Sequence, residues 1–140
     1  MKKFKFKFEP ILNIRSHKVT MAKEDLAKVI FEKNKRYDKI SDYEEEISSL
    51  LVYTINDMLY LQARNNRVNH IETLIKKLEN EIQNIEEIEK VRRDRLSELL
   101  KDEKIMEKLK ENDFEKFKFE INKKENEFID EIANQRAHKR

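Results

Sequence analysis

The stretch HIETLIKKLENEIQNI (residues 70–85) carries the pattern that decides the fold. Its apolar residues recur at alternating intervals of four and three, at Ile71, Ile75, Leu78, Ile82 and Ile85. This spacing is typical of a coiled coil, in which a helix buries a narrow apolar stripe against another helix. The stretch therefore predicts a long helix that packs on a partner helix.

Similar stripes flank this segment on both sides. Phe114, Ile121 and Phe128 recur every seven residues, and the first half of the chain holds a stripe formed by Val19, Ala22, Leu26, Ile30, Tyr37, Ile40, Ile47, Leu51, Ile55 and Met58. Lys33 interrupts the first stripe, and the pattern is weak between Glu89 and Arg95. Such slips change the local supercoil without ending a helix. Glu-to-Lys or Glu-to-Arg pairs four residues apart, such as Glu32–Arg36, add helix stability of roughly 0.2–0.5 kcal/mol each.

The composition agrees with a fold that makes few turns. Charged residues are 43% of the 140-residue chain, against a usual value of about 25%. The chain has no glycine and one proline, the two residues that turns most often need. We therefore expect one domain over residues 1–140, built from long helices.

The position of the turn follows from the weakest helical stretch. Asparagines gather between residues 56 and 69, and asparagine is a poor interior residue but a good N-cap. We expect Asn65 or Asn66 to cap the second helix, and a capping box at Ser41–Glu44 offers a competing break. The predicted fold is all-α, with two long helices forming an antiparallel coiled-coil hairpin: helix 1 at about 10–58, a turn within 56–69 and helix 2 at about 66–137. Both termini are expected at the same end.

The N-terminal stretch KFKFKF (residues 3–8) alternates as a strand would, but the chain offers no second strand to pair with it. We expect an extension that is mobile in isolation, whose phenylalanines pack when a partner arrives. A membrane-surface peptide is the alternative. No apolar run suits a signal peptide or a transmembrane helix.

The sequence offers no catalytic machinery. Without glycine there is no phosphate-binding loop, and without cysteine there is no thiolate nucleophile or thiolate metal site. His17 and His138 would approach each other in a hairpin but are interpreted as solvated, and the acidic run at residues 42–46 is interpreted as a solvated helix face. We therefore expect no enzyme activity, catalytic residue, cofactor, metal or small-molecule substrate.

Positive charge gathers near both ends of the chain. Residues 1–18 hold Glu9 as their only acid against six cations, Lys2, Lys3, Lys5, Lys7, Arg15 and Lys18, and the chain ends in RAHKR. A hairpin would bring these segments together into one basic end, which would be either a solubilising terminus or an electrostatic plug for an acidic partner. Nucleic acid is not expected, because the net charge is only +2 and no reader motif occurs.

Three blocks resemble the FliJ family, the small coiled-coil proteins of the flagellar type III export apparatus. The blocks are FKFKFEPILNIRSHKVTMAKEDLA (4–27), HIETLIKKLENEI (70–82) and ENEFIDEIANQRAHKR (125–140). The resemblance implies a cytoplasmic protein at the membrane-proximal flagellar base. It would act as a stalk that enters the hexameric export ATPase ring, favours ring assembly and reaches the cytoplasmic domain of the membrane-embedded export gate. The family is also described as escorting export chaperones.

Two sets of residues follow from this resemblance and from the basic end. The ATPase-ring contact is expected at Phe4, Lys5, Phe6, Lys7, Phe8, Arg15, Arg136 and Arg140. The export-gate contact maps by resemblance onto Leu74, Leu78, Glu81 and Ile85, of which Leu78 and Ile85 also belong to the apolar seam. Two alternatives remain: a structural coiled-coil tether with no role in ATP hydrolysis, and a basic-ended membrane or nucleic-acid binder.

Overall fold

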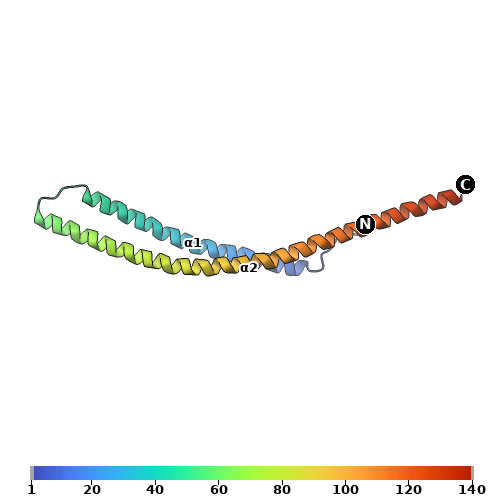
Figure 1. Ribbon diagram of the computed structural model, residues 1–140, viewed down its shortest axis with the longest axis horizontal. Coiled ribbons are helices and arrows are strands. Elements are labelled where there is room, and N and C mark those ends of the chain that lie inside the picture. The colour runs from blue at the N-terminus through green and yellow to red at the C-terminus, as the bar shows by residue number, and fades with distance from the viewer. Residues whose placement is uncertain (1, 140) are drawn as a thin grey trace. The chain divides into compact units, whose positions relative to one another are not determined.

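The computed structural model describes residues 2–139, which form two long helices (Figure 1). Helix α1 covers Glu9–Leu51, helix α2 covers Met58–His138, and residues 52–57 link them. No strand occurs among residues 2–139. The predicted all-α fold of two long helices packed against each other is confirmed. None of the helices described is apolar enough over a bilayer-spanning length to cross a membrane.

The helices divide into two units, each of which pairs part of α1 with part of α2. The linker unit is Met21–Ser97 and contains the connection between the helices. The terminal unit joins the residues up to Thr20 with the residues from Glu98 onward. Each unit has its own seam of apolar residues, as described below.

The seam of the linker unit includes Ile71, whose side chain is fully buried. Ile82 on α2 is also buried, and Ala22, Leu26 and Ile40 are the buried apolar residues of α1 in this unit. Ion pairs bridge the two helices beside this seam: Arg67 with Glu46 at 2.9 Å, Arg36 with Glu81 at 3.0 Å and Arg92 with Asp25 at 3.3 Å. Their order along the two helices establishes the antiparallel arrangement.

The two irregular positions of the apolar stripes face each other. The Lys33 ammonium lies 2.6 Å from a Glu89 carboxylate oxygen, and both side chains are largely covered. Arg93, one turn further along α2, contacts the other Glu89 oxygen at 3.2 Å. Hydrogen bonds from Lys33 and then from Arg93 lower the pKa of Glu89, which favours its ionised form. The interruption of one stripe is thus complementary to the interruption of the other.

The connection between the helices lies earlier than the sequence pattern predicts. Helix α1 ends at Leu51 instead of about residue 58, and α2 begins at Met58 instead of about residue 66. Asp57 is the N-cap, because its carboxylate accepts the backbone N–H of Leu59 at 2.9 Å and its carbonyl accepts the N–H of Leu61 at 3.0 Å. Asn65 and Asn66 are exposed residues inside α2, and Ser41–Glu44 lies inside α1.

In the terminal unit, residues 2–8 form a non-helical strap along α2 (Figure 1). Phe6 of the strap, Leu12 of α1 and Met106 of α2 form a buried cluster, and Phe4 packs against it. The expectation that these phenylalanines lack a core in the isolated chain is therefore wrong for Phe6. A strap with alternating residues can bury one face on a helix, which is why Phe4 and Phe6 lie inward while Lys5 and Lys7 stay exposed.

Candidate functional site

The strap is attached to α2 by aromatic contacts. The ring of Phe4 lies edge-on to the Phe114 ring, with centroids 5.2 Å apart, and 5.5 Å from the Phe117 centroid. Glu9, at the start of α1, forms an ion pair with Lys110 of α2 at 2.9 Å. Of the strap phenylalanines expected to contact a partner, Phe6 is buried, Phe4 is half-buried and Phe8 is 36% exposed. Only Phe8 presents a substantial part of its ring to solvent.

A lysine-rich groove runs between the strap and α2. Its lining includes Phe4, Phe117, Asp113 and Glu120 together with five lysines, Lys2, Lys3, Lys5, Lys7 and Lys116. None of these five lysines forms an ion pair with another residue in the 2–139 range, whereas Lys110 is held by Glu9. The groove therefore offers several ammonium groups without a carboxylate partner around an aromatic floor, although the ammonium of Lys7 lies 5.7 Å from the centroid of the Phe8 ring.

Arg15 does not contribute a free cation to this groove. Its Nη1 donates a hydrogen bond to the backbone carbonyl oxygen of Asp102 at 2.9 Å, and the residue is half-buried. Arg15 therefore ties α1 to α2 within the terminal unit. Any role for Arg15 in binding a partner would require this contact to open or the remaining guanidinium N–H groups to be used.

The expected meeting of the two basic segments at one end is wrong. Lys2 shares a groove with Glu125, but Arg136 lies eleven residues beyond Glu125, which is roughly 16 Å along an α-helix. Arg15 contacts Asp102, so Arg136 lies roughly 50 Å further along α2. The reason is that α2 continues past the strap within the terminal unit (Figure 1), which also separates His17 from His138.

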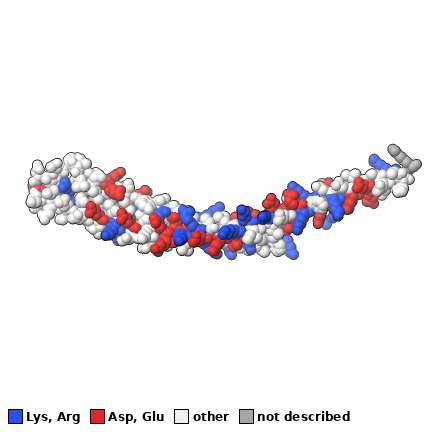
Figure 2. Space-filling model, viewed as in Figure 1, with Lys and Arg blue, Asp and Glu red and all other residues white. Residues whose placement is uncertain are grey.

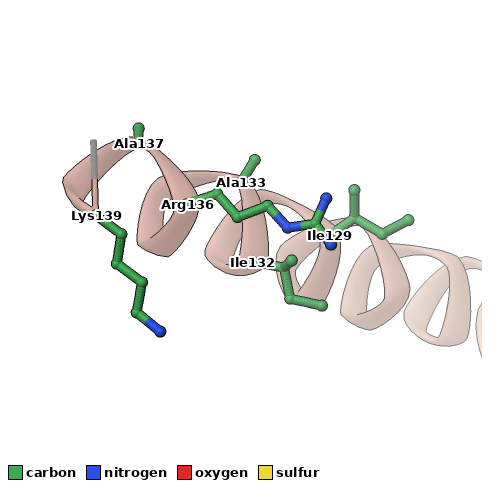
Figure 3. A pocket seen from close by; sticks show the side chains of 6 residues that line it. All are labelled: Ile129, Ile132, Ala133, Arg136, Ala137 and Lys139. Carbon is green, nitrogen blue, oxygen red and sulfur yellow. The ribbon is translucent and has the colours of Figure 1, made fainter.

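The last turns of α2 form a surface of their own. Arg136 extends along the helix past Ala133 toward Ile129, while Ile132 and Lys139 flank the same shallow depression (Figure 3). Phe128 and Ile129 are 63% and 61% exposed, so this part of α2 has an apolar side that no described residue covers. Arg140, the other expected contact in this region, lies outside the described residues.

The residues that resemble the gate-binding face lie together on α2 in the linker unit. Leu74, Leu78, Glu81 and Ile85 are all half-buried, so Leu74 is not a freely exposed flank of the seam. Glu81 accepts a hydrogen bond from Nε of Arg36 at 3.0 Å. Hydrogen bonds to Glu32 and then to Glu81 raise the pKa of Arg36, which favours its charged form.

Part of this face opens into an apolar groove. Ile85 lines it together with Val29 of α1 and Ile88 of α2, and Ile88 is 48% exposed. The polar edge of the groove is formed by Lys28, Glu32 and Arg36. A partner could thus contact Ile85 and Ile88 without separating the two helices.

Sequence reasoning missed a second group of exposed apolar residues, here called the tip. It consists of residues on both sides of the linker: Leu51, Val52, Tyr53, Met58, Leu59 and Tyr60. The pattern assigned Leu51 and Met58 to the buried stripe, but they are 55% and 77% exposed. The available signal was the scarcity of charge, because Asp57 is the only charged residue from 47 to 63.

Comparison with known proteins identifies the family. The family model described as the flagellar FliJ protein matches residues 4–140. No curated protein and no solved structure gives a significant match. The family match covers nearly the whole chain, including most of the strap, both helices and the last turns of α2. The chain therefore belongs to the FliJ family of flagellar proteins, which are export-apparatus components.

Proposed function

We propose that this export-apparatus component is a stalk that binds the export ATPase ring, promotes ring assembly and links the ring to the export gate. The contact with the ring would involve the terminal unit, and the contact with the cytoplasmic domain of the gate would involve the linker unit. The protein would work in the cytoplasm, at the membrane-proximal base of the flagellum, and would also escort export chaperones. These roles need binding surfaces and no catalytic residues of its own.

The observation that carries the ring contact is the combination of the lysine-rich groove with the uncovered last turns of α2. The groove presents five lysines without ion-pair partners among residues 2–139. Beyond the strap, α2 exposes Phe128 and Ile129 near Arg136. Free ammonium groups accelerate encounter with an acidic surface, while apolar burial holds the resulting complex. The ring contact would thus extend along α2 instead of being concentrated at one basic end.

The gate contact is supported by the arrangement of Leu74, Leu78, Glu81 and Ile85 on one helix. All four are accessible in part, and Ile85 opens into the groove with Val29 and Ile88. Half-buried apolar side chains at this position can pack on a partner while still contributing to the seam between the helices. Glu81 would contribute through Arg36, whose position it helps to fix.

ATP hydrolysis by the purified export ATPase tests the ring contact. The Arg136→Glu and Arg140→Glu double variant should abolish stimulation of ATP hydrolysis, while its helicity, measured by circular dichroism, stays unchanged. Deletion of residues 2–8 should weaken the stimulation. A matched control reverses charge on the linker unit, as Lys76→Glu with Lys77→Glu, two exposed residues that should leave stimulation intact. If both test variants stimulate like the parent chain, the terminal unit is not the ring-binding part and a structural tether becomes the better description.

Binding to the purified cytoplasmic domain of the gate tests the second contact. Leu74→Ala and Leu78→Ala should each weaken binding, measured by calorimetry at a temperature where both variants are fully helical. Because both side chains are half-buried, both variants should also melt at a lower temperature than the parent. Asn80→Ala, an exposed position on the same helix, is the control. Unchanged affinity in both leucine variants would remove this face from the gate contact.

A further inference from the structure

The tip consists of two runs of exposed apolar residues, one on each side of the linker. Val52, Tyr53, Met58, Leu59 and Tyr60 are 73%, 74%, 77%, 76% and 68% exposed, and Leu51 is 55% exposed. Figure 2 shows the linker end of the paired helices as a mostly uncharged surface. In a chain in which 43% of residues are charged, a stretch from 47 to 63 with Asp57 as its only charge is unusual. Contiguous apolar surface of this kind marks an interaction site.

The tip is held in a defined conformation by its own contacts. Nη1 of Arg64 donates a hydrogen bond to the carbonyl oxygen of Tyr53 at 3.1 Å, which fixes the start of the linker against α2. Asp57 caps α2 through Leu59 and so fixes the end of the linker. A partner would therefore meet a preformed surface and would not have to order a loose loop, a cost that reduces affinity.

The residues around the tip carry a net negative charge. From residue 39 to residue 67 there are three cations, Lys39, Arg64 and Arg67, against five carboxylates, Asp42, Glu44, Glu45, Glu46 and Asp57. Arg67 is paired with Glu46, whereas Asp42, Glu44 and Glu45 are exposed and form no ion pair within residues 2–139. These three free carboxylates, here called the acidic collar, lie on α1 about two turns before the tip.

The acidic collar decides between the occupants that an apolar tip could have. An anionic membrane surface would repel the collar as the tip approached. A second tip, in a symmetric dimer, would bring two collars together, which also costs free energy. A folded protein with cationic side chains around an apolar pocket would satisfy both the apolar tip and the collar.

We propose that the tip inserts into an apolar pocket of a protein partner whose rim carries lysine or arginine side chains. Tyr53 and Tyr60 would anchor the contact, because tyrosine buries a large ring and keeps its hydroxyl group available for a hydrogen bond. The surface is separate from the face proposed for the gate, since Tyr60 precedes Leu74 by fourteen residues, roughly 21 Å along α2. Glu44 and Glu45 would orient the partner and make the contact sensitive to salt.

Site-specific photo-crosslinking in flagellated cells tests this proposal with the full-length chain. Leu59 is replaced by the photoreactive, apolar p-benzoyl-phenylalanine, and the same replacement at Asn80, an exposed position of the linker unit, is the control. The adduct from the tip is then sequenced. A second chain carries Glu44→Lys and Glu45→Lys in addition, and its matched control carries Glu79→Lys and Glu87→Lys, two other exposed acids of the same unit.

The expected result is an adduct formed from position 59 and not from position 80, on a peptide of another protein that has apolar residues next to lysine or arginine. Its yield should fall roughly five-fold or more in the Glu44/Glu45 variant and stay unchanged in the Glu79/Glu87 control, in line with charge pairing across an interface. Reversing the charge of the cations identified on the partner should restore the yield with the Glu44/Glu45 variant.

Four outcomes would overturn the proposal. An adduct with lipid would assign the tip to a membrane, and an adduct with a second copy of this chain would assign it to self-association. No adduct above the Asn80 control would mean that the tip has no partner. A protein adduct whose yield does not respond to reversal of the collar charges would contradict the cationic rim.

Discussion

Replacing Phe6 by alanine tests whether the strap is held on α2 by its aromatic side chains. Phe6 is only 8% exposed and lies in a cluster with Leu12 and Met106. Within the part of the chain that the structure describes, the backbone of residues 2–5 forms no hydrogen bond with α2, and the backbone hydrogen bonds near the strap lead from α1 to Phe6 and Phe8. Side-chain burial therefore supplies most of the attraction between the strap and the helix.

The size of the effect follows from that burial. Covering a phenylalanine side chain completely stabilises the covered state by roughly 1.5–3 kcal/mol. The cavity cost of a core substitution need not be added, because a terminal strap can swing away and leave no cavity. A loss of about 2 kcal/mol would lower the ratio of attached to released strap by about 30-fold. The two helices themselves should remain paired.

Pulsed electron paramagnetic resonance, which measures the distance between two spin labels, shows whether the strap is attached to α2. The chain contains no cysteine, so cysteines introduced at Lys3 and Lys124 would be the only labelling sites, and both positions are exposed in the terminal unit. We expect a narrow distance distribution in the parent and a broad one, shifted to longer distances, in the Phe6→Ala chain. The thermal unfolding of the helices, followed by circular dichroism, should change little.

Phe119→Ala is the matched control, since Phe119 is the same residue type on nearby α2 but is 70% exposed. It should leave the distance distribution unchanged. A Phe6→Ala chain that keeps the parent distribution would refute the reasoning, because the strap would then be held by something other than the burial of Phe6. A parent chain with an already broad distribution would show that the strap is released without any substitution.

Three further predictions concern the linker unit. Ile71→Ala should lower the free energy of unfolding by about 2–5 kcal/mol in denaturant titrations, because the removed side chain is fully buried; a loss below 1 kcal/mol would contradict the assigned seam. Asp57→Ala should cost about 1 kcal/mol by the same assay, whereas Asn65→Ala should cost far less if Asp57 is the true N-cap. The pKa of Glu89 lies below its ordinary value of 4.5, so the stabilisation that ionised Glu89 gives the fold is present above that pH and is lost as the pH falls through the lowered pKa. Glu89→Gln should therefore remove this contribution to the acid sensitivity of thermal melting. An unchanged pH profile of thermal melting in the variant would exclude the Lys33–Glu89 pair as a cause of that sensitivity.

The sequence pattern predicted the pairing of the helices but not where each helix ends. Periodicity identified the seam at Ile71 and Ile82 because burial repeats along a helix with a fixed spacing. Near the linker the chain has many apolar residues and little charge, so the stripe appeared to continue through Leu51 and Met58. The start of α2 is set by Asp57, whose carboxylate caps the helix through a single hydrogen bond. The sequence could not identify this N-cap, because several nearby asparagines have side chains that can cap a helix equally well.

The candidate sites depended on contacts that no periodic pattern records. The alternation of Lys and Phe in the strap indicated neither a strand nor a helix, because its apolar face is buried on a helix distant in sequence. The meeting of the two basic segments was expected because a hairpin was taken to bring both termini to one end, but α2 has 81 residues and α1 has 43, so α2 continues past the strap. The exposed tip was visible in the sequence as a scarcity of charge, although its exposure required the structure.

The antiparallel ion pairs also imply an order of folding. The contact of Arg67 with Glu46 joins residues 21 positions apart, Arg36 and Glu81 are 45 apart, and Glu9 and Lys110 are 101 apart. The entropy lost in closing a loop increases with the number of residues enclosed, so the contacts nearest the linker form most readily and each contact shortens the loop that remains for the next. The helices should therefore pair from Asp57 outward, and the strap should attach last and detach first. A nascent chain would emerge with α1 complete and unpaired until the first turns of α2 are made, so its exposed leucines and isoleucines would need protection during synthesis.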